Sequence, residues 1–173
     1  MELIANQYCL YVHTYNVKTL NTLDMKLEEE IKQKKFNNEY EKLVVNVLYT
    51  GNWMNLVNTK NLKSYGLTLP QYNVLRILRG QYPKPATVNL LIDRMLDKSS
   101  NASRIVDRLL AKNLVTRRIC KKDRRSVDVV VKEKGLDLLK LIDSAQTKWR
   151  KQFETLSEEE AKKLNFLLDK LRG

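Results

Sequence analysis

Apolar residues recur at three- and four-residue steps from about residue 38, which predicts a long amphipathic helix. The residues of this stripe are Tyr40, Leu43, Val44, Val47, Leu48, Gly51, Met54 and Val57. We expect the stripe to be buried. Ahead of it, "MKLEEEIKQKKF" from Met25 is also typical of a helix, whereas residues 1–24 show no clear pattern. We expect them to be a loosely packed extension or an arm exchanged between subunits.

Three shorter helices follow, separated by polar turns. Thr68 and Gln71 stand in capping-box spacing with Pro70 in the first turn, so a helix begins there and ends at "QYPKPA". Thr87 is a candidate cap for the next helix, which "DKSS" interrupts. Ser99 is a candidate cap for the third. The helices that begin at Thr68 and Thr87 are therefore predicted to stand in series, joined by a tight polar turn, with the helix after Ser99 as the third.

The helix after Ser99 has two distinct faces. Its apolar face consists of Ala102, Ile105, Val106 and Leu109. The opposite face consists of Ser100, Ser103, Arg104 and Arg108, with Asn101 on its flank and Asp107 between the arginines. Hydroxyls, amides and guanidinium groups hydrogen-bond base edges and phosphates in a major groove. The second face is therefore a candidate for reading DNA.

Two β-branched segments after this helix, "LVTRRIC" and "VDVVV", predict a two-stranded hairpin with "KKDRRS" at its tip. The chain carries 32 Lys and Arg against 20 Asp and Glu, a net charge of +12. Residues 98–125 alone hold ten basic and two acidic side chains, a net charge of +8. The basic ones are Lys98, Arg104, Arg108, Lys112, Arg117, Arg118, Lys121, Lys122, Arg124 and Arg125. Such a run is often only a solvated surface, but here it coincides with a helix-turn-helix and a hairpin, which favours nucleic acid.

The C-terminal part of the chain predicts two more amphipathic helices. The first carries Leu138, Ile142, Ala145, Trp149 and Phe153. The second begins at a capping box of Ser157 and Glu160 and carries Ala161, Leu164, Leu167, Leu168 and Leu171. Together with the helix from residue 38, these two helices carry more apolar surface than one compact domain can cover. A homodimer built from the terminal helices is expected, and packing within one subunit is the alternative.

Several classes of protein are disfavoured by the composition. Cys9 and Cys120 are far apart and in no metal-binding spacing, so we expect no disulfide and no metal. His13 is the single histidine, and the five glycines form no phosphate-binding loop, so neither catalysis nor a cofactor is expected. No apolar run is long enough to span a membrane, and the first residues lack a secretion signal. We expect a cytoplasmic protein of one domain.

From about residue 38 onward the chain resembles the MarR family of winged-helix transcription regulators. The resemblance is carried by "LTLPQYNVL", "NASRIVDRLLAKNLVTRR", "DRRS" and "LSEEEAKKLNFLLDKL". It implies a mainly α (α+β) fold, a winged helix-turn-helix with a two-stranded wing and flanking dimerisation helices. The expected parts are an extension (1–24), an N-terminal helix (25–66), the DNA-binding region (67–131) and C-terminal dimerisation helices (132–173).

The resemblance also implies a mode of DNA binding. The helix from Ser99 would enter the major groove, Arg125 at the wing tip would reach the minor groove, and Asp123 would brace the tip through an ion pair. The complete expected DNA-binding set is Ser99, Ser100, Asn101, Ser103, Arg104, Arg108, Lys121, Lys122, Arg124 and Arg125. The implied function is a homodimeric repressor on a pseudopalindromic operator, relieved by a small effector. The alternative is a basic protein–protein interaction module that binds an acidic partner.

The chain departs from the family pattern around the wing. Asn113 replaces the usual Gly before the first wing strand, at a position where the helix must end in a left-handed residue. Val131-Lys132 replaces the usual Leu-Thr, whose Thr caps the next helix, so that helix is expected to start around Glu133.

Four aromatic residues are candidates for an effector site: Tyr49, Trp53, Tyr65 and Tyr72. Family members commonly bind small phenolic or anionic effectors between their dimerisation and winged regions. Aromatic residues at helical spacing more often belong to a core or a dimer interface, which is the competing interpretation.

Overall fold

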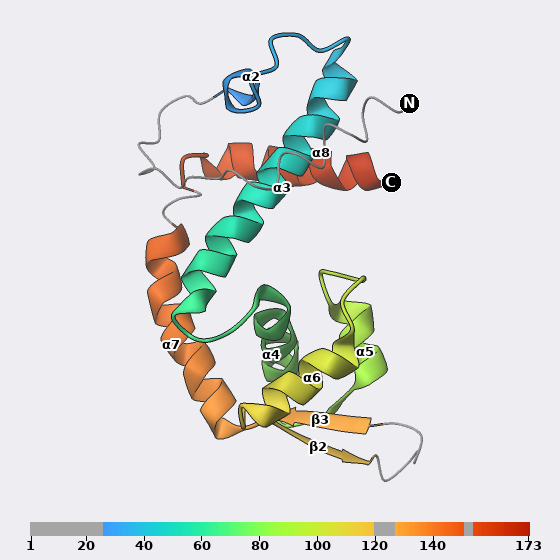
Figure 1. The fold of residues 1–173 in the computed structure, drawn as a ribbon, viewed down its shortest axis with the longest axis vertical. Coiled ribbons are helices and arrows are strands. Elements are labelled where there is room, and N and C mark those ends of the chain that lie inside the picture. Colours follow the sequence, from blue (N-terminus) through green and yellow to red (C-terminus); the bar gives the residue numbers. More distant parts are fainter. Residues whose placement is uncertain (1–25, 120–126, 151–153) are drawn as a thin grey trace. The chain divides into compact units, whose positions relative to one another are not determined.

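The structure, a computed structural model, describes residues 26–119, 127–150 and 154–173 (Figure 1). The chain forms two compact units, and the division falls within one long helix, between Asn52 and Trp53. The predictions for residues 1–24 lie outside the described residues. So do those for the two cysteines, the histidine, the wing-tip residues Lys121, Lys122, Asp123, Arg124 and Arg125, and the side chains of Trp149 and Phe153.

The first unit contains α2 (Leu27–Glu30) and the beginning of α3 (Glu39–Lys63). The helix predicted over "MKLEEEIKQKKF" is much shorter than expected. Short isolated helices are marginal, because forming the first turn is costly. Here Lys32 takes a left-handed φ of 53°, which is incompatible with continuing the helix.

Side-chain contacts tie α2 to α3. Lys42 Nζ lies 2.5 Å from Glu28 Oε1, and the Tyr49 hydroxyl donates a hydrogen bond to the Glu30 carboxylate. The bond from Lys42 lowers the pKa of Glu28, and the same bond raises the pKa of Lys42. These contacts use one side of α3, on which Val45 and Tyr49 are half-buried.

The apolar stripe of α3 is largely exposed in the single chain, so its expected burial against a second copy stays a prediction. Tyr40 is 81% exposed, Val44 54% and Leu48 49%. A stripe that the described residues leave exposed is available to another surface.

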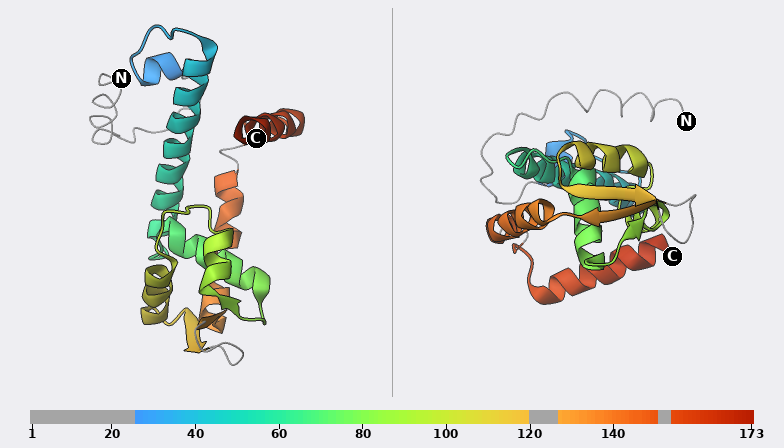
Figure 2. Two further views of the ribbon diagram at one scale, coloured as in Figure 1. Left: turned by 90° about the vertical axis from the view of Figure 1, so that its right-hand side faces the viewer. Right: turned by 90° about the horizontal axis from the view of Figure 1, so that it is seen from below.

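The winged region consists of three helices and a three-stranded antiparallel sheet. The helices are α4 (Leu69–Gln81), α5 (Val88–Arg94) and α6 (Ala102–Ala111); the strands are β1 (Ala86–Thr87), β2 (Val115–Ile119) and β3 (Val127–Val131), in the order β1-β3-β2. The hairpin register pairs Val115 with Val131 and Ile119 with Val127. In Figures 1 and 2, α6 runs beside β2 and β3. Only β1 was not predicted, because two residues are too few to show a strand pattern.

The helix starts follow the predicted caps. Gln71 N–H donates to Thr68 Oγ1 at 3.4 Å, and Thr68 N–H donates to Gln71 Oε1 at 3.2 Å, which completes the capping box of α4. The Thr87 hydroxyl accepts a hydrogen bond from the Leu90 amide at the start of α5. The core between these elements contains Leu62, Leu75, Leu78, Leu91, Leu109, Leu139 and Ile142, all exposed by less than 2%.

The C-terminal helices are α7 (Glu133–Arg150) and α8 (Glu158–Arg172). As predicted, α7 starts at Glu133. A Cβ atom on Gly135 would lie 2.6 Å from the Leu114 carbonyl oxygen, so only glycine permits this close packing. The buried face of α7 contains Leu139 and Ile142, whereas Leu138 is only half-buried. The predicted Ser157–Glu160 capping box starts α8, none of whose residues is buried.

Candidate nucleic-acid interface

The N-terminus of α6 is built differently from the sequence expectation. Its N-cap is Asn101, whose Oδ1 accepts the Arg104 amide at 2.9 Å, and not Ser99. The reason is that Asp97 engages both preceding serines. Its Oδ1 accepts the Ser99 amide at 2.9 Å and the Ser99 hydroxyl at 2.6 Å, and its Oδ2 accepts the Ser100 hydroxyl at 2.5 Å. The helix therefore begins two residues later than Ser99 would allow.

Asp97 was not among the predicted site residues, although an Asp two residues before a Ser is a known turn signal. The hydrogen bonds from Ser100 and then Ser99 lower the pKa of Asp97. Because both hydroxyl hydrogens are donated to Asp97, the oxygens of Ser99 and Ser100 are left as acceptors. In this arrangement they suit the amino groups of adenine or cytosine better than phosphate oxygens, which also accept.

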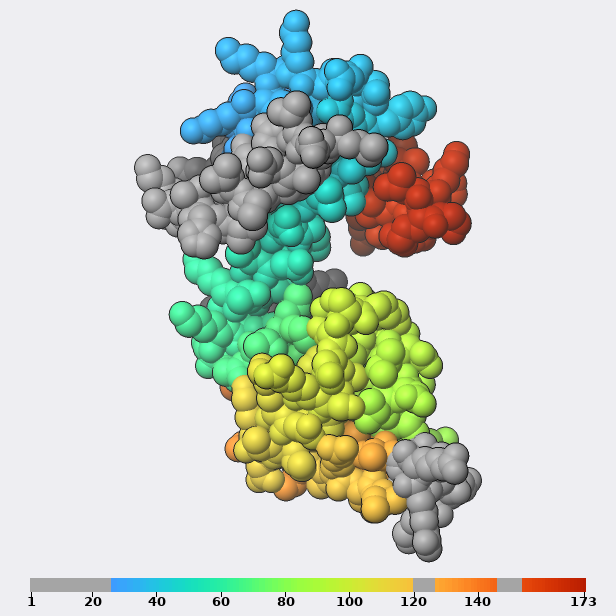
Figure 3. All heavy atoms as spheres, turned by 45° about the vertical axis from the view of Figure 1, so that its right-hand side comes forward, coloured from blue at the N-terminus to red at the C-terminus, as the bar shows by residue number. Residues whose placement is uncertain are grey.

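The two faces of α6 agree with the prediction. Its buried residues are Ala102, Ile105, Val106 and Leu109. Ser103, Arg104 and Arg108 are exposed, and the space-filling view shows this part of the chain at the surface beside α5 (Figure 3). A helix held by four apolar side chains thus presents a hydroxyl and two guanidinium groups to solvent.

A hollow of about 390 Å³ lies between the first turn of α4 and the segment 100–108, which leads into α6 and forms its first two turns. Its lining residues are Thr68, Pro70, Gln71, Ser100, Asn101, Arg104, Ile105 and Arg108. Two arginines and the start of a helix contribute positive potential to this hollow, which suits a phosphate group.

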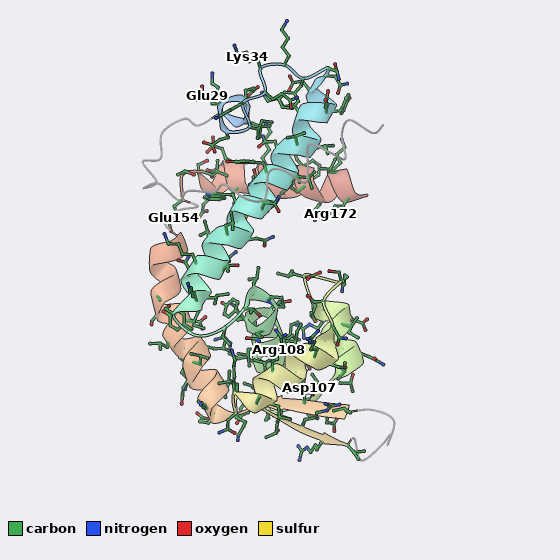
Figure 4. The ribbon with its side chains drawn as sticks, in the orientation of Figure 1. Glu29, Lys34, Asp107, Arg108, Glu154 and Arg172 are labelled. Atoms are coloured by element: carbon green, nitrogen blue, oxygen red, sulfur yellow. The ribbon has the colours of Figure 1, made fainter. Side chains whose placement is uncertain are left out.

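The basic side chains of residues 98–119 fall into two groups. Three are engaged within the chain. Arg117 on β2 lies 2.5 Å from Asp107 on α6, Lys98 donates to the Ile92 and Asp93 carbonyls at the end of α5, and Lys112 donates to Gly66 and Gln71. Figure 4 labels Asp107 on the side of α6 near the strands, with Arg108 one residue further along the helix.

The second group consists of Arg104, Arg108 and Arg118, which have no acidic partner within the described part of the chain. These three arginines are therefore the charges of residues 98–119 most readily offered to a polyanion. Asp107, which the sequence places between two of them, neutralises a wing-strand arginine instead.

The turn into the wing agrees with the prediction. Asn113 has a φ of 60°, the left-handed conformation expected where α6 ends. Lys132 N–H donates to the Leu114 carbonyl at 2.9 Å, which joins the two ends of the hairpin just before α7.

The four candidate effector residues lie in different surroundings. Tyr49 belongs to the first unit, where it binds Glu30. Tyr65 and Tyr72 pack against the core of the second unit, and the Tyr72 hydroxyl accepts a hydrogen bond from Arg76 at 2.8 Å. Trp53 is half-buried. None of them lines the hollow beside α6, so an effector role stays a prediction.

The described residues show neither a metal-binding cluster nor a membrane-spanning helix. In residues 26–119, 127–150 and 154–173, no group of three or more His, Cys, Asp or Glu side chains is placed to hold a metal ion. No helix in the same ranges is long and apolar enough to cross a membrane.

A helix-turn-helix followed by a two-stranded wing defines the winged-helix class, and known proteins of that class share this architecture. A putative MarR-like regulator from Bacillus cereus is 21% identical, with a TM-score of 0.69, and the match covers 78% of this chain and 96% of that one. A mutant MarR from E. coli, solved with operator DNA, is 22% identical, with a TM-score of 0.67 and coverages of 80% and 99%. BpsR from Bordetella bronchiseptica, whose DNA binding is regulated by 6-hydroxynicotinic acid, is 20% identical, with a TM-score of 0.61 and coverages of 76% and 99%.

The sequence comparison leads to the family. Residues 65–126 match the model of the MarR family, a range that covers α4 to the wing. The comparison with curated protein sequences gave no match. The winged helix-turn-helix region is therefore similar to the MarR family, whose members are transcription regulators.

Proposed function

We propose that this chain is a homodimeric, sequence-specific regulator that binds double-stranded DNA and represses transcription until a small effector releases it. The observation that carries the proposal is the exposed face of α6. Ser103, Arg104 and Arg108 are exposed on a helix whose opposite face is buried, within a winged helix-turn-helix. That is the arrangement by which recognition helices present side chains to base edges in a major groove.

The dimer is supported by apolar surface that the chain leaves open. Val44, Val47 and Leu48 on α3 are exposed, as are Leu164, Phe166, Leu167 and Leu171 on α8. Large exposed apolar faces on two separate helices favour burial against a second copy. Two-fold symmetry would then present two copies of α6 to half-sites one helical turn apart, which calls for a pseudopalindromic operator.

Repression and effector release are the finer parts of the proposal. A dimer that occupies an operator overlapping a promoter excludes polymerase, which makes repression the simplest outcome. The similarity to BpsR, whose DNA binding 6-hydroxynicotinic acid regulates, supports a small aromatic or anionic effector. Tyr65 and Tyr72 are the candidates on the second unit. Acting on DNA, the protein is expected in the cytoplasm.

Selection from a library of random duplexes tests the proposal. The expected result is enrichment of one pseudopalindromic sequence with half-sites about 10 base pairs apart, centre to centre. Absence of enrichment would contradict sequence-specific binding. The alternative, an acidic protein partner, predicts that polyglutamate competes for the protein as well as the best duplex does. A reporter with the selected sequence at its promoter then separates repression from activation.

A further inference from the structure

Lys112 is the C-cap residue of α6, and its side chain reaches the turn before α4 and the first turn of α4. Its Nζ donates hydrogen bonds to the Gly66 carbonyl and to Gln71 Oε1, the latter at 3.2 Å. Gly66 lies between α3 and α4, and Gln71 lies in the first turn of α4. One lysine side chain therefore joins the end of α6 to the start of α4, two helices earlier in the chain.

The acceptor on α4 is a well-fixed group. Gln71 is only 3% exposed, and its Oε1 also accepts the Thr68 amide at 3.2 Å as part of the capping box. The Lys112 ammonium group thus shares the atom that fixes the first turn of α4. Hydrogen bonds from a charged donor are stronger than neutral ones, so this contact is well suited to hold two helices in register.

The backbone of Lys112 is engaged as well. Its N–H donates to the Arg108 carbonyl at 3.3 Å, and its carbonyl oxygen accepts from Lys134 Nζ, also at 3.3 Å. Lys134 lies in the first turn of α7. The C-terminal end of α6 is consequently connected to the α3–α4 turn, to α4 and to α7.

The groups proposed to read DNA lie toward the other end of α6, from Asn101 to Arg108. A helix of ten residues is about 15 Å long, so a small tilt at Lys112 displaces Asn101 and Ser103 by more than a hydrogen bond tolerates. A shift of that kind changes contacts with base edges far more than general attraction to phosphates, which depends on charge.

We propose that Lys112 is a positioning residue, which sets operator preference by holding α6 against α4 and the α3–α4 turn and not by touching DNA. From the sequence, Lys112 belongs to the basic group of residues 98–125 that favours nucleic acid. In the structure, its ammonium group instead donates to Gly66 and Gln71 of the same chain. The inference rests on the proposed DNA-binding function.

The experiment compares wild type with Lys112→Met, Lys112→Gln and the control Lys60→Met. Lys60 is an exposed lysine of α3, outside the helix-turn-helix, so its loss removes the same charge without the bridge. Fluorescence anisotropy measures the affinity for the selected operator and for a scrambled duplex over a series of salt concentrations. Circular dichroism reports whether each variant is folded.

We expect both Lys112 variants to be folded and to lose about tenfold in the ratio of operator to scrambled affinity, the order of one mismatched base pair. Their affinity for scrambled DNA and the slope of log K against log salt should match those of Lys60→Met. A phosphate contact at Lys112 would instead lower both affinities and reduce the slope by about 0.9, which would overturn the proposal. An unchanged ratio of operator to scrambled affinity would also overturn the proposal, because Lys112 would then not affect operator preference. Loss of the fold in both variants would overturn it as well, because the bridge would then serve stability alone. A wild type without preference for any duplex would refute the proposed function itself.

Discussion

The winged region and the terminal helices differ in how they use apolar residues. From Leu62 to Ile142, the winged region has a core of its own, built from buried aliphatic side chains of its helices and strands. In contrast, α8 has no buried residue and α3 buries only Leu62, although both carry a regular apolar stripe. The same helical periodicity thus accompanies a self-contained core in one region and, in the other, an apolar surface that is exposed in the single chain.

Breaking the proposed partner surface should have the largest effect. Val44→Glu places a charge on the exposed stripe of α3, and deletion of residues 157–173 removes α8. We expect monomers or aggregates with at least about a hundredfold weaker operator binding, because bivalent binding on two half-sites is lost. Light scattering and anisotropy measure both effects. Asn46→Glu on the opposite face of α3 is the control, and a Val44→Glu variant that remained a dimer would place the interface elsewhere.

Substitutions in the core of the winged region should lower its stability without changing the assembly of the protein. Leu75→Ala is expected to lower the free energy of unfolding by about 2–5 kcal/mol, since Leu75 is fully buried. Leu167→Ala on α8 is the matched change at a residue that is 48% exposed in the single chain. It should alter the concentration dependence of the melting temperature, because the proposed dimer would bury this side chain against the second copy. Equal concentration dependence in both variants would remove the distinction between the regions.

The wing tip lies outside the described residues, so the expectation for it comes from the sequence. Arg125→Ala should reduce operator affinity about tenfold and lower the slope of log K against log salt by about one. Asp123→Ala should weaken binding as well, although it makes the protein more positive, because Asp123 is expected to hold the tip. Titrations at two salt concentrations measure both. Tighter binding by Asp123→Ala would indicate a plain basic patch without a shaped wing.

The smallest expected effect concerns the cap of α6. Asn101→Ala should cost about 1 kcal/mol of stability, because Asn101 satisfies the Arg104 amide. Ser99→Ala should lower stability by less, since the Ser99 hydroxyl bonds to Asp97 and not to an amide of the helix. Urea denaturation of both variants measures the difference, and the reverse order would restore Ser99 as the cap.

Much of the fold could be predicted because local chemistry determines it. Thr68, Gln71 and Pro70 mark the start of α4, and Ser157 with Glu160 marks that of α8, since capping requires specific side chains at fixed spacing. The left-handed Asn113 follows from local chemistry as well, whereas the start of α7 at Glu133 was expected from the loss of the Thr cap that the family pattern carries. The two faces of α6 were evident from a strong 3.6-residue period.

The errors arose where contacts distant in the sequence, or competing local ones, decide the outcome. Periodicity cannot distinguish a stripe buried in its own chain from one buried by a partner, so burial of the α3 stripe in a dimer stays a prediction. Composition cannot tell that Lys112 binds Gly66 and Gln71, which lie more than forty residues away. At the start of α6, Ser99 was the predicted cap, but its hydrogen bonds to Asp97 leave Asn101 as the cap.

The most direct test of the central claim, that α6 reads the sequence of duplex DNA, is the binding of Arg104→Ala to the selected operator and to a scrambled duplex. Arg104 is exposed and has no acidic partner among the described residues. We predict that the variant loses about 1–3 kcal/mol on the operator and markedly less on the scrambled duplex. Equal affinity of wild type and Arg104→Ala for the operator would contradict the account.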